Sequence, residues 1–203
     1  KYIQFYTMNE LARILMKMSG TVVPNDVKYV YCFAHNKINI PCMAKGLKHN
    51  IANKTLCILD NKHQMSGVLP CDNNYNIYNS YDFKIETIPY DICLNSINTR
   101  TESEAVVNWI AENNIQQLAI CAPPYHTLRA FMTLVSICIE RGLNINIYTI
   151  NGMVDDWNDI TITHNGDTNT SFNNVIELEL ERIKKYTEKG DICVCDKIWN
   201  YIK

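Results

Sequence analysis

The sequence predicts an α/β fold, a three-layer sandwich in which a mostly parallel sheet carries helices on both faces. Short apolar runs alternate along the chain with longer segments of helical periodicity. The apolar run 118–122 has the length of a strand that is buried on both faces. Behind it, apolar residues recur at helical spacing as far as Glu140-Arg141-Gly142. Strands and helices of this length are typically joined by right-handed crossovers.

Composition favours one ordinary globular domain spanning 1–203. The chain has 203 residues, of which 47% are hydrophobic and 20% charged, as in soluble globular proteins. A net charge of -2 without a Lys/Arg run argues against a nucleic-acid partner. No apolar stretch approaches the ~20 residues that a membrane span requires, and the first residues lack a signal-peptide core.

The cysteines predict a reducing environment. Nine cysteines are present, an odd number, and no Cys-x-x-Cys pair occurs. Most lie in apolar segments, so we expect free thiols in a cytoplasmic protein. Cys193 and Cys195 alternate in a strand-like run and would share a face. No metal site is predicted, because no Cys or His spacing typical of ligands is repeated.

The first half of the chain begins with a predicted packing helix. Thr7-Met8-Asn9-Glu10 has the pattern of a capping box, and Ser19-Gly20 would end the helix. Its buried face should carry Leu11, Ile14, Leu15 and Met18. A central strand over 29–34, a short helix over 43–49, a strand over 55–59 and an edge strand over 83–88 should follow. The irregular stretch 60–82 is either a functional lid or a surface insertion.

The second half should begin with another capping box, Thr101-Glu102-Ser103-Glu104, which opens a helix closed by Asn113-Asn114. Beyond the strand and helix described above, residues 143–150 alternate as in a strand. Residues 151–170 form a polar loop, and 175–186 form an amphipathic helix. The pattern of 192–201 does not assign a structure.

The strongest functional feature is the turn between strand 118–122 and its helix. Pro123 and Pro124 end the strand, which places Tyr125, His126 and Arg129 at its carboxyl end, where ligands of parallel sheets bind. Arg129 could clamp a phosphate or carboxylate at a solvent-filled crevice. His126 could exchange protons with a substrate. The structural alternative is that His126 caps the turn while Arg129 pairs with a neighbouring carboxylate.

Two further loops should lie at the same edge of the sheet. Asn98, Arg100 and Thr101 precede or begin a helix, and we expect them to approach His126 and Arg129 across one cleft. The alternative is that this loop only caps its helix, a contribution of about 1 kcal/mol. Residues His35 and Asn36 follow the first strand and complete the predicted ligand-binding set.

These motifs carry a family resemblance. Arg100-Thr101-x-x-x-Ala105, then an apolar strand, then Tyr125-His126-x-x-Arg129-Ala130, resembles the SanA/YdcF/ElyC-like family of uncharacterised bacterial proteins. The similarity extends over about residues 28–150, with helical additions on either side. It implies a Rossmann-like fold and a nucleotide-like ligand, with S-adenosylmethionine one candidate cofactor.

The chain also departs from that family. Ala34-His35-Asn36 replaces the usual Gly-Gly loop after the first strand, and Ser103-Glu104 replaces an acidic-Asn pair. Cys121-Ala122-Pro123-Pro124 stands where small hydroxyl residues are frequent. These changes affect the expected ligand more than the expected fold.

The sequence therefore predicts a domain that binds a small anionic or nucleotide-like ligand, with hydrolase or transferase activity as one reading. The alternatives are a non-catalytic ligand sensor or interaction module, or an S-adenosylmethionine-binding protein. A P-loop NTPase is excluded because no Gly-x-x-x-x-Gly-Lys occurs. A dinucleotide dehydrogenase is disfavoured because no Gly-rich loop follows the first strand.

Overall fold

A computed structural model describes residues 8–33, 39–48, 54–59, 83–89, 98–162 and 168–203. Its main sheet has five strands in the order β3-β2-β1-β4-β5, and every neighbouring pair is parallel. The strands are β1 (Tyr29–Cys32), β2 (Thr55–Leu59), β3 (Lys84–Ile88), β4 (Gln117–Ala122) and β5 (Asn146–Asn151). This order is that of a Rossmann-like sheet, with the strand order reversing between β1 and β4.

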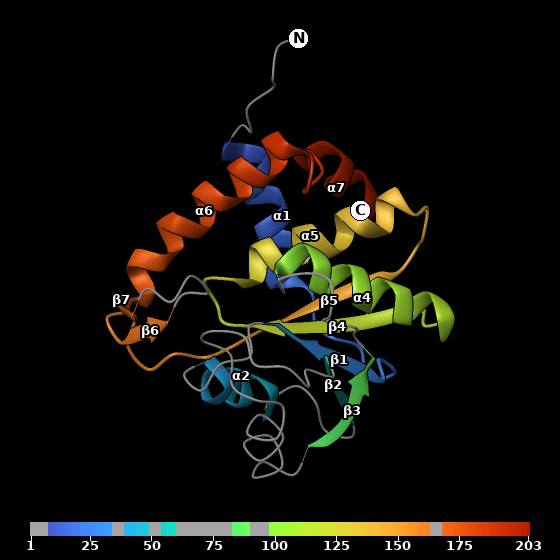
Figure 1. Cartoon of the computed structure of the whole chain (residues 1–203), viewed down its shortest axis with the longest axis horizontal. Helices are drawn as coiled ribbons and strands as arrows, with labels where there is room; N and C mark the ends of the chain where they lie inside the picture. The colour runs from blue at the N-terminus through green and yellow to red at the C-terminus, as the bar shows by residue number, and fades with distance from the viewer. Residues whose placement is uncertain (1–7, 34–38, 49–53, 60–82, 90–97, 163–167) are drawn as a thin grey trace.

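Helices cover both faces of this sheet, which confirms the predicted fold class (Figure 1). Helix α2 (Asn39–Lys48) lies on one face. The opposite face carries α4 (Thr99–Glu112) and α5 (Thr127–Glu140), with the remaining helices packed around them. These are α1 (Met8–Gly20), α6 (Phe172–Lys189) and α7 (Cys195–Ile202).

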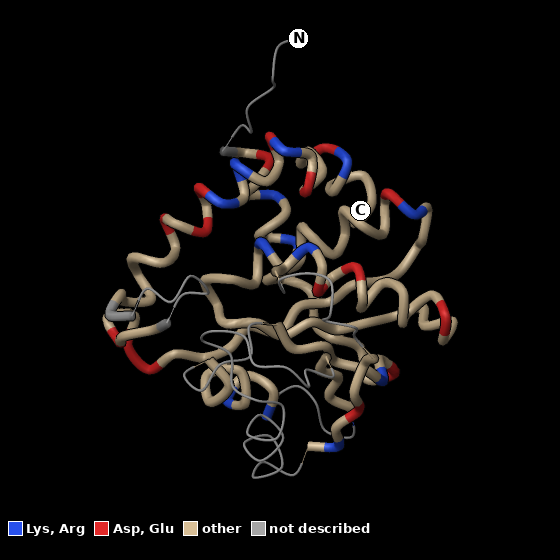
Figure 2. The backbone as a smooth tube through the Cα atoms, viewed as in Figure 1, with Lys and Arg blue, Asp and Glu red and all other residues tan. Residues whose placement is uncertain are grey.

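Strand β4 shows how one apolar run serves two cores. Leu118, Ile120 and Ala122 lie in the core under α4 and α5. Ala119 and Cys121 lie in the core under α2. Successive side chains of a strand point to opposite faces, so a strand between two helical layers must be apolar at nearly every position. Charged residues accordingly lie mostly on the helices rather than the central strands (Figure 2).

Several predicted elements are present, although β1 ends at Cys32 rather than residue 34 and β3 begins at Lys84 rather than residue 83. The strand over 55–59 is β2, the edge strand is β3, and the strand expected at the centre is β1. The helix over 128–139 extends from Thr127 to Glu140. Gly142 follows it with φ 64°, a left-handed conformation that suits glycine after a helix.

Other expectations are corrected. Leu15 was expected on the buried face of α1 but is 49% exposed, because Leu11, Ile14 and Met18 alone form the inward stripe. Helix α2 begins at Asn39 rather than near 43, since Pro41 is tolerated in a first helical turn. Strand β5 begins at Asn146 rather than 143.

The C-terminal third contains more structure than its sequence indicated. Within the predicted polar loop 151–170, β6 (Ile160–Ile162) and β7 (Thr168–Ser171) pair as an antiparallel hairpin. The unassigned tail forms α7, so Cys193 and Cys195 do not share a strand. The stretch 60–82 and the predicted cap at Thr7 lie outside the described residues.

Two further properties concern the described residues alone. None of their helices combines the length and the apolar character needed to cross a membrane. Their seven cysteines all carry free thiols: Cys32, Cys42, Cys57, Cys121, Cys138, Cys193 and Cys195.

Candidate functional site

Three hydrogen bonds of the turn between β4 and α5 converge on one carbonyl oxygen, that of Pro123. Pro123 O accepts from the amides of His126 at 2.8 Å and Thr127 at 3.1 Å, and also from the Thr127 hydroxyl at 3.1 Å. Proline has no N–H group to donate to a neighbouring strand, which is why β4 ends before Pro123. His126 occupies the N-cap position of α5, yet its side chain makes no capping hydrogen bond there. The imidazole is therefore directed to another partner.

That partner is Glu179 of α6, at the centre of a buried group that we call the Glu179 cluster (His126, Arg129, Glu179 and Arg182). His126 Nδ1 lies 3.0 Å from Glu179 Oε2. Arg129 donates to the same carboxylate twice, from Nε at 2.6 Å and Nη2 at 3.1 Å. Arg182 Nη1 donates to Glu179 Oε1 at 2.6 Å. The cluster joins the first turn of α5 to the middle of α6.

Burial and charge fix the protonation states in this cluster. Burial alone would raise the pKa of Glu179, but His126 and Arg129 hold it well below its usual range. Burial lowers the pKa of His126, and Arg129 lowers it further against the opposing effect of Glu179. A neutral His126 that donates from Nδ1 to the carboxylate carries its basic lone pair on Nε2. This is the tautomer of a carboxylate-oriented general base.

Arg129 consequently occupies an environment other than the expected solvent-filled crevice. Its side chain is 7% exposed, and its bidentate partner is the internal carboxylate of Glu179. This arrangement is the structural alternative that the sequence left open. His126 is 1% exposed, so its ring also belongs to the protein interior.

The second predicted loop caps its helix with a different residue from the one expected. Asn98 is the N-cap of α4, and its side chain accepts from the amides of Arg100 at 2.9 Å and Thr101 at 3.1 Å. Thr101 Oγ1 in turn accepts from the Asn98 amide at 3.1 Å. The predicted cap at Thr101 is thus one half of a box that starts three residues earlier, because the asparagine side chain reaches both amides.

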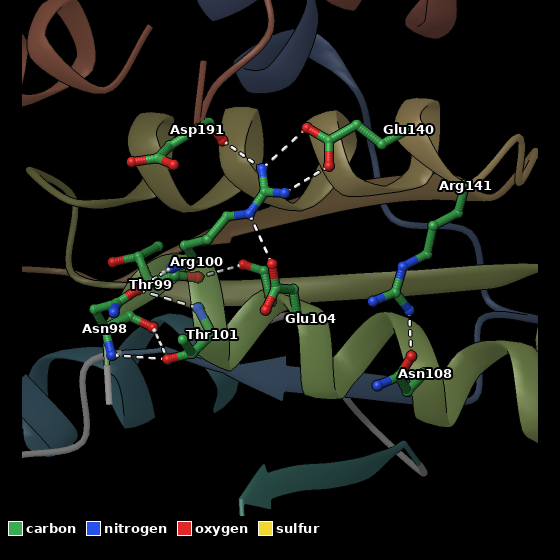
Figure 3. Close-up of polar contacts among 10 residues, drawn as sticks. Asn98, Thr99, Arg100, Thr101, Glu104, Asn108, Glu140, Arg141 and Asp191 are labelled. Carbon is green, nitrogen blue, oxygen red and sulfur yellow. Dashed lines mark hydrogen bonds and ion pairs between the residues drawn. The ribbon is translucent and has the colours of Figure 1, made fainter. Parts of the chain in front are cut away.

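Arg100 links three parts of the molecule (Figure 3). Its guanidinium donates to Glu140 at the end of α5, with Nη1 at 3.0 Å and Nη2 at 2.5 Å from the two carboxylate oxygens. It also donates to Glu104 at 2.9 Å and to the carbonyl oxygen of Asp191 at 2.8 Å. Hydrogen bonding to Glu140 raises the pKa of Arg100, although burial opposes it. Glu104 therefore pairs with Arg100 instead of closing a capping box.

The two predicted loops meet through Thr99, whose Oγ1 accepts from Arg129 Nη1 at 2.7 Å. Beside this bond lies a cavity of about 340 Å³, which we call the α4–α6 cavity. Residues from α4, α5, α6 and the segment after α6 line it, including Thr99, Arg100, Arg129, Tyr186, Lys189 and Asp191. The Tyr186 ring makes cation–π contacts with two side chains: Arg129 Cζ lies 5.8 Å and Lys189 Nζ lies 5.7 Å from its centroid.

A second buried carboxyl group lies near Arg129. Tyr31 of β1 donates its hydroxyl proton to Glu102 Oε1 of α4 at 2.7 Å. Burial raises the pKa of Glu102 to about 8, against the opposing effects of the Tyr31 hydrogen bond and the Arg129 charge. Burial therefore favours the protonated, uncharged form of Glu102.

Of the predicted ligand-binding residues that the structure describes, Tyr125 and Thr101 do not line the cavity. Tyr125 is buried against Phe172 and Val175, and its hydroxyl accepts from Asn39 Nδ2 at 3.0 Å. Burial raises the pKa of Tyr125 to about 12. His35 and Asn36 lie outside the described residues.

Sequence reasoning missed Glu179 and Glu102, although both leave a recognisable signal. Glu179 lies four residues from Val175 and four from Ile183, both buried on the inner stripe of α6. Glu102 lies four residues before the buried Val106 of α4. A carboxylate within the apolar stripe of a helix requires a buried partner. That partner's identity cannot be read from the helix itself.

Within the described part of the chain, no group of three or more His, Cys, Asp or Glu side chains is arranged to hold a metal ion.

Neither a protein-family model nor a curated protein matches the chain. Among solved structures, the U34-tRNA thiolase NcsA from Methanococcus maripaludis, with its 4Fe-4S cluster, is 12% identical with a TM-score of 0.40, covering 96% of this chain and 79% of that one. A pantothenate synthetase from Thermus thermophilus is 7% identical with a TM-score of 0.40, covering 94% of this chain and 80% of that one. Similarity at this level does not bear on ligand or reaction.

Proposed function

We propose that the protein binds a small anionic, nucleotide-like ligand in the α4–α6 cavity. The observation that carries the proposal is the sharing of one carboxylate by two guanidinium groups. Arg129 and Arg182 contribute two positive charges to the Glu179 cluster, and Glu179 contributes one negative charge. With His126 neutral, the Glu179 cluster itself carries one surplus positive charge, and Arg129 of this cluster lies on the cavity wall beside Lys189 and Asp191. Arg182 is 18% exposed whereas Arg129 is nearly buried, so a bound anion would pair the surplus charge on the Arg129 side of the cluster.

The cavity has suitable donors for such a ligand. A guanidinium carries five N–H groups, and Arg129 uses three of them in its bonds to Glu179 and Thr99. Lys189 contributes an exposed ammonium group to the wall. A volume of about 340 Å³ lies at the small end of the range for ligand pockets, roughly 300–1,000 Å³. The amides of Arg100 and Thr101 are taken up by Asn98, so side chains would make the contacts.

A ligand screen by thermal shift tests this proposal. Inorganic phosphate, AMP, a sugar phosphate and S-adenosylmethionine form the panel, because the resemblance to the SanA/YdcF/ElyC-like family also favours a nucleotide-like ligand here. A ligand present at a hundredfold its Kd should add about 2.7 kcal/mol to the free energy of unfolding. We expect at least one phosphate-bearing compound to do so.

Two matched variants locate the site. Lys189→Gln should weaken binding of the ligand found, because Lys189 lines the cavity. Lys185→Gln removes the same charge from an exposed position of the same helix that is not on the wall, and it should bind like the unmodified protein. Equal affinities for the two variants would reject the cavity as the site.

Turnover is a second candidate, favoured by the bond between His126 and Glu179. This bond leaves Nε2 as the basic nitrogen, which suits proton transfer in a hydrolase or transferase. However, Arg129 rather than His126 lies on the cavity wall, which favours the sensor reading. Incubation of the ligand with the protein, followed by NMR of the products, decides between the two. Product formation that His126→Ala abolishes, with binding retained, would establish the enzyme.

A further inference from the structure

Strand β5 is an edge strand of unusual composition. Its sequence, NIYTIN, contains no charged residue, whereas β3 at the opposite edge carries Lys84 and Glu86 (Figure 2). Edge strands usually avoid pairing with foreign strands through charges, proline, a bulge or a cover. The sequence of β5 contains neither charge nor proline, and its pairing with β4 is regular over all six positions. Strand β5 thus lacks three of these protections.

The direction of its backbone groups follows from two hydrogen bonds. The Asn146 amide donates to the carbonyl oxygen of Gln116, directly before β4, at 3.0 Å, and the Gly152 amide donates to that of Ala122, at the end of β4, at 2.9 Å. Because the groups of successive residues alternate in direction, the N–H and C=O groups of Ile147 and Thr149 point away from β4. Asn151 lies close to α2, where Gly46 approaches its carbonyl oxygen. The part of the edge that a further strand could use is therefore centred on residues 147–149.

A cavity of about 340 Å³, which we call the β5 groove, lies against this edge. Its walls come from β5, from Phe131 of α5 and from the C-terminal ends of α1 and α7, including Met18, Tyr201 and Ile202. Lys17 and Lys203 contribute two exposed ammonium groups, and no Asp or Glu is among the described residues that line it. The Tyr201 hydroxyl is bonded to the backbone of Ile145 at 2.8 and 2.9 Å, which fixes α7 beside the strand.

We propose that the β5 edge takes up an extended, acidic segment of a partner protein as an additional strand. Backbone groups of Ile147 and Thr149 would supply the ladder, and Lys17 and Lys203 would select carboxylate side chains. Strand addition of this kind draws affinity from the main chain and specificity from the flanking side chains. A second copy of this chain is disfavoured, because pairing two β5 edges would bring the same lysines together.

A fluorescein-labelled peptide of four Glu-Val repeats tests the proposal by fluorescence anisotropy with the full chain. Its alternation places carboxylates on one face of a strand and valines on the other. We expect saturable binding that weakens with added salt, because the charged contacts are screened. A Lys-Val peptide of the same length should bind at least about tenfold more weakly. Equal binding of both peptides would overturn the proposal.

A pair of double variants tests the contribution of the lysine charges to peptide binding. Lys17→Glu combined with Lys203→Glu should lower the affinity for the acidic peptide by about tenfold or more, because two surface ion pairs are lost together. The control is Lys185→Glu combined with Lys197→Glu, which makes the same change of charge at exposed positions outside the groove. The control should bind as the unmodified protein does. A similar loss of peptide affinity in both double variants would show that only the net charge of the protein matters, and it would overturn the proposal.

Ile147→Pro tests the backbone contribution. It deletes an outward N–H group and leaves the ladder to β4 intact, a position where proline is tolerated in edge strands. Peptide binding should fall by about tenfold, while circular dichroism shows the same fold. Unchanged peptide affinity would show that no strand is added. A concentration-dependent dimer in sedimentation, dissolved by this substitution, would overturn the proposal in favour of self-pairing.

Discussion

The charge state of Glu102 affects the stability of the protein in a pH-dependent way. Burial raises its pKa to about 8 from 4.5, so between those values the native state binds a proton that the unfolded chain releases. The free energy of unfolding therefore falls as pH rises through this window, by up to about 1.4 kcal/mol per pH unit. His126 acts in the opposite direction, because burial lowers its pKa and protonation favours the unfolded chain.

Glu102→Gln isolates the contribution of this carboxyl group. A glutamine keeps the oxygen that accepts from Tyr31 and does not titrate. We expect the variant to gain stability relative to the unmodified protein as pH rises from about 5 to 8, since only the unmodified protein must take up a proton at this position in order to fold. Urea unfolding at a series of pH values measures the difference. Parallel stability curves would show that Glu102 is ionised throughout.

Glu179 pairs with two guanidinium groups. Its removal should lower the free energy of unfolding more than the loss of an exposed ion pair would. Glu179→Gln leaves Arg129 without an ionised partner in the interior, which should lower the free energy of unfolding by about 3–5 kcal/mol. Glu104→Gln is the control, because its bond to Arg100 joins side chains that are 38% and 25% exposed; that change should cost no more than about 1 kcal/mol. Similar melting temperatures for the two variants would contradict this ranking.

At the scale of elements, local signals predicted helices and strands better than they predicted partners. The Pro-Pro turn placed His126 and Arg129 at the start of α5 because proline restricts the backbone directly. Glu179 lies 53 and 50 residues from these side chains. Its contact depends on how α6 packs across α5, which no local pattern encodes. The β6–β7 hairpin was missed because β6 has only three residues and β7 has only four, all polar, so neither shows a recognisable strand pattern.

The approach of α2 to the end of β5 leaves no room for a side chain at Gly46. A Cβ atom at Gly46 would overlap the carbonyl oxygen of Asn151, a backbone atom that cannot rotate away. Gly46→Ala should therefore lower the free energy of unfolding by about 1–3 kcal/mol, the scale of overpacking, despite the better helix propensity of alanine. Gly20→Ala is the control, because nothing lies within 4 Å of its added Cβ. A stabilised Gly46→Ala protein would contradict this contact.

At the scale of the whole molecule, the alternation of strands and helices predicted a parallel sheet because parallel strands need long crossovers. It did not predict that β1 and β4 would be neighbours. Burial accounts for the three inner positions: β1, β2 and β4 each contribute fully buried apolar residues to both cores, and they lie between the two helical layers. The less buried β3 and β5 lie at the edges.

The same two cores should protect most of the cysteines from reagents. Cys57 and Cys121 are fully buried, and burial raises the pKa of both thiols far above the usual range. Cys193 is partly exposed. Among the seven cysteines of the described residues, a maleimide in native buffer should therefore modify Cys193 first, while the buried thiols react only at the rate at which the protein opens. Peptide mass spectrometry over a time course gives each rate separately.

In concentrated guanidinium chloride without reductant, all nine cysteines should react, because we expect no disulfide in the chain. A pair that stays unmodified until reductant is added would identify a bridge and contradict the predicted reducing environment. Glu179→Gln extends the test to the whole fold. If Cys121 is reached only by global opening, its labelling should accelerate by the factor that corresponds to the lost stability, about tenfold for each 1.4 kcal/mol. An unchanged rate would instead mean that the sheet opens locally, independently of the Glu179 cluster.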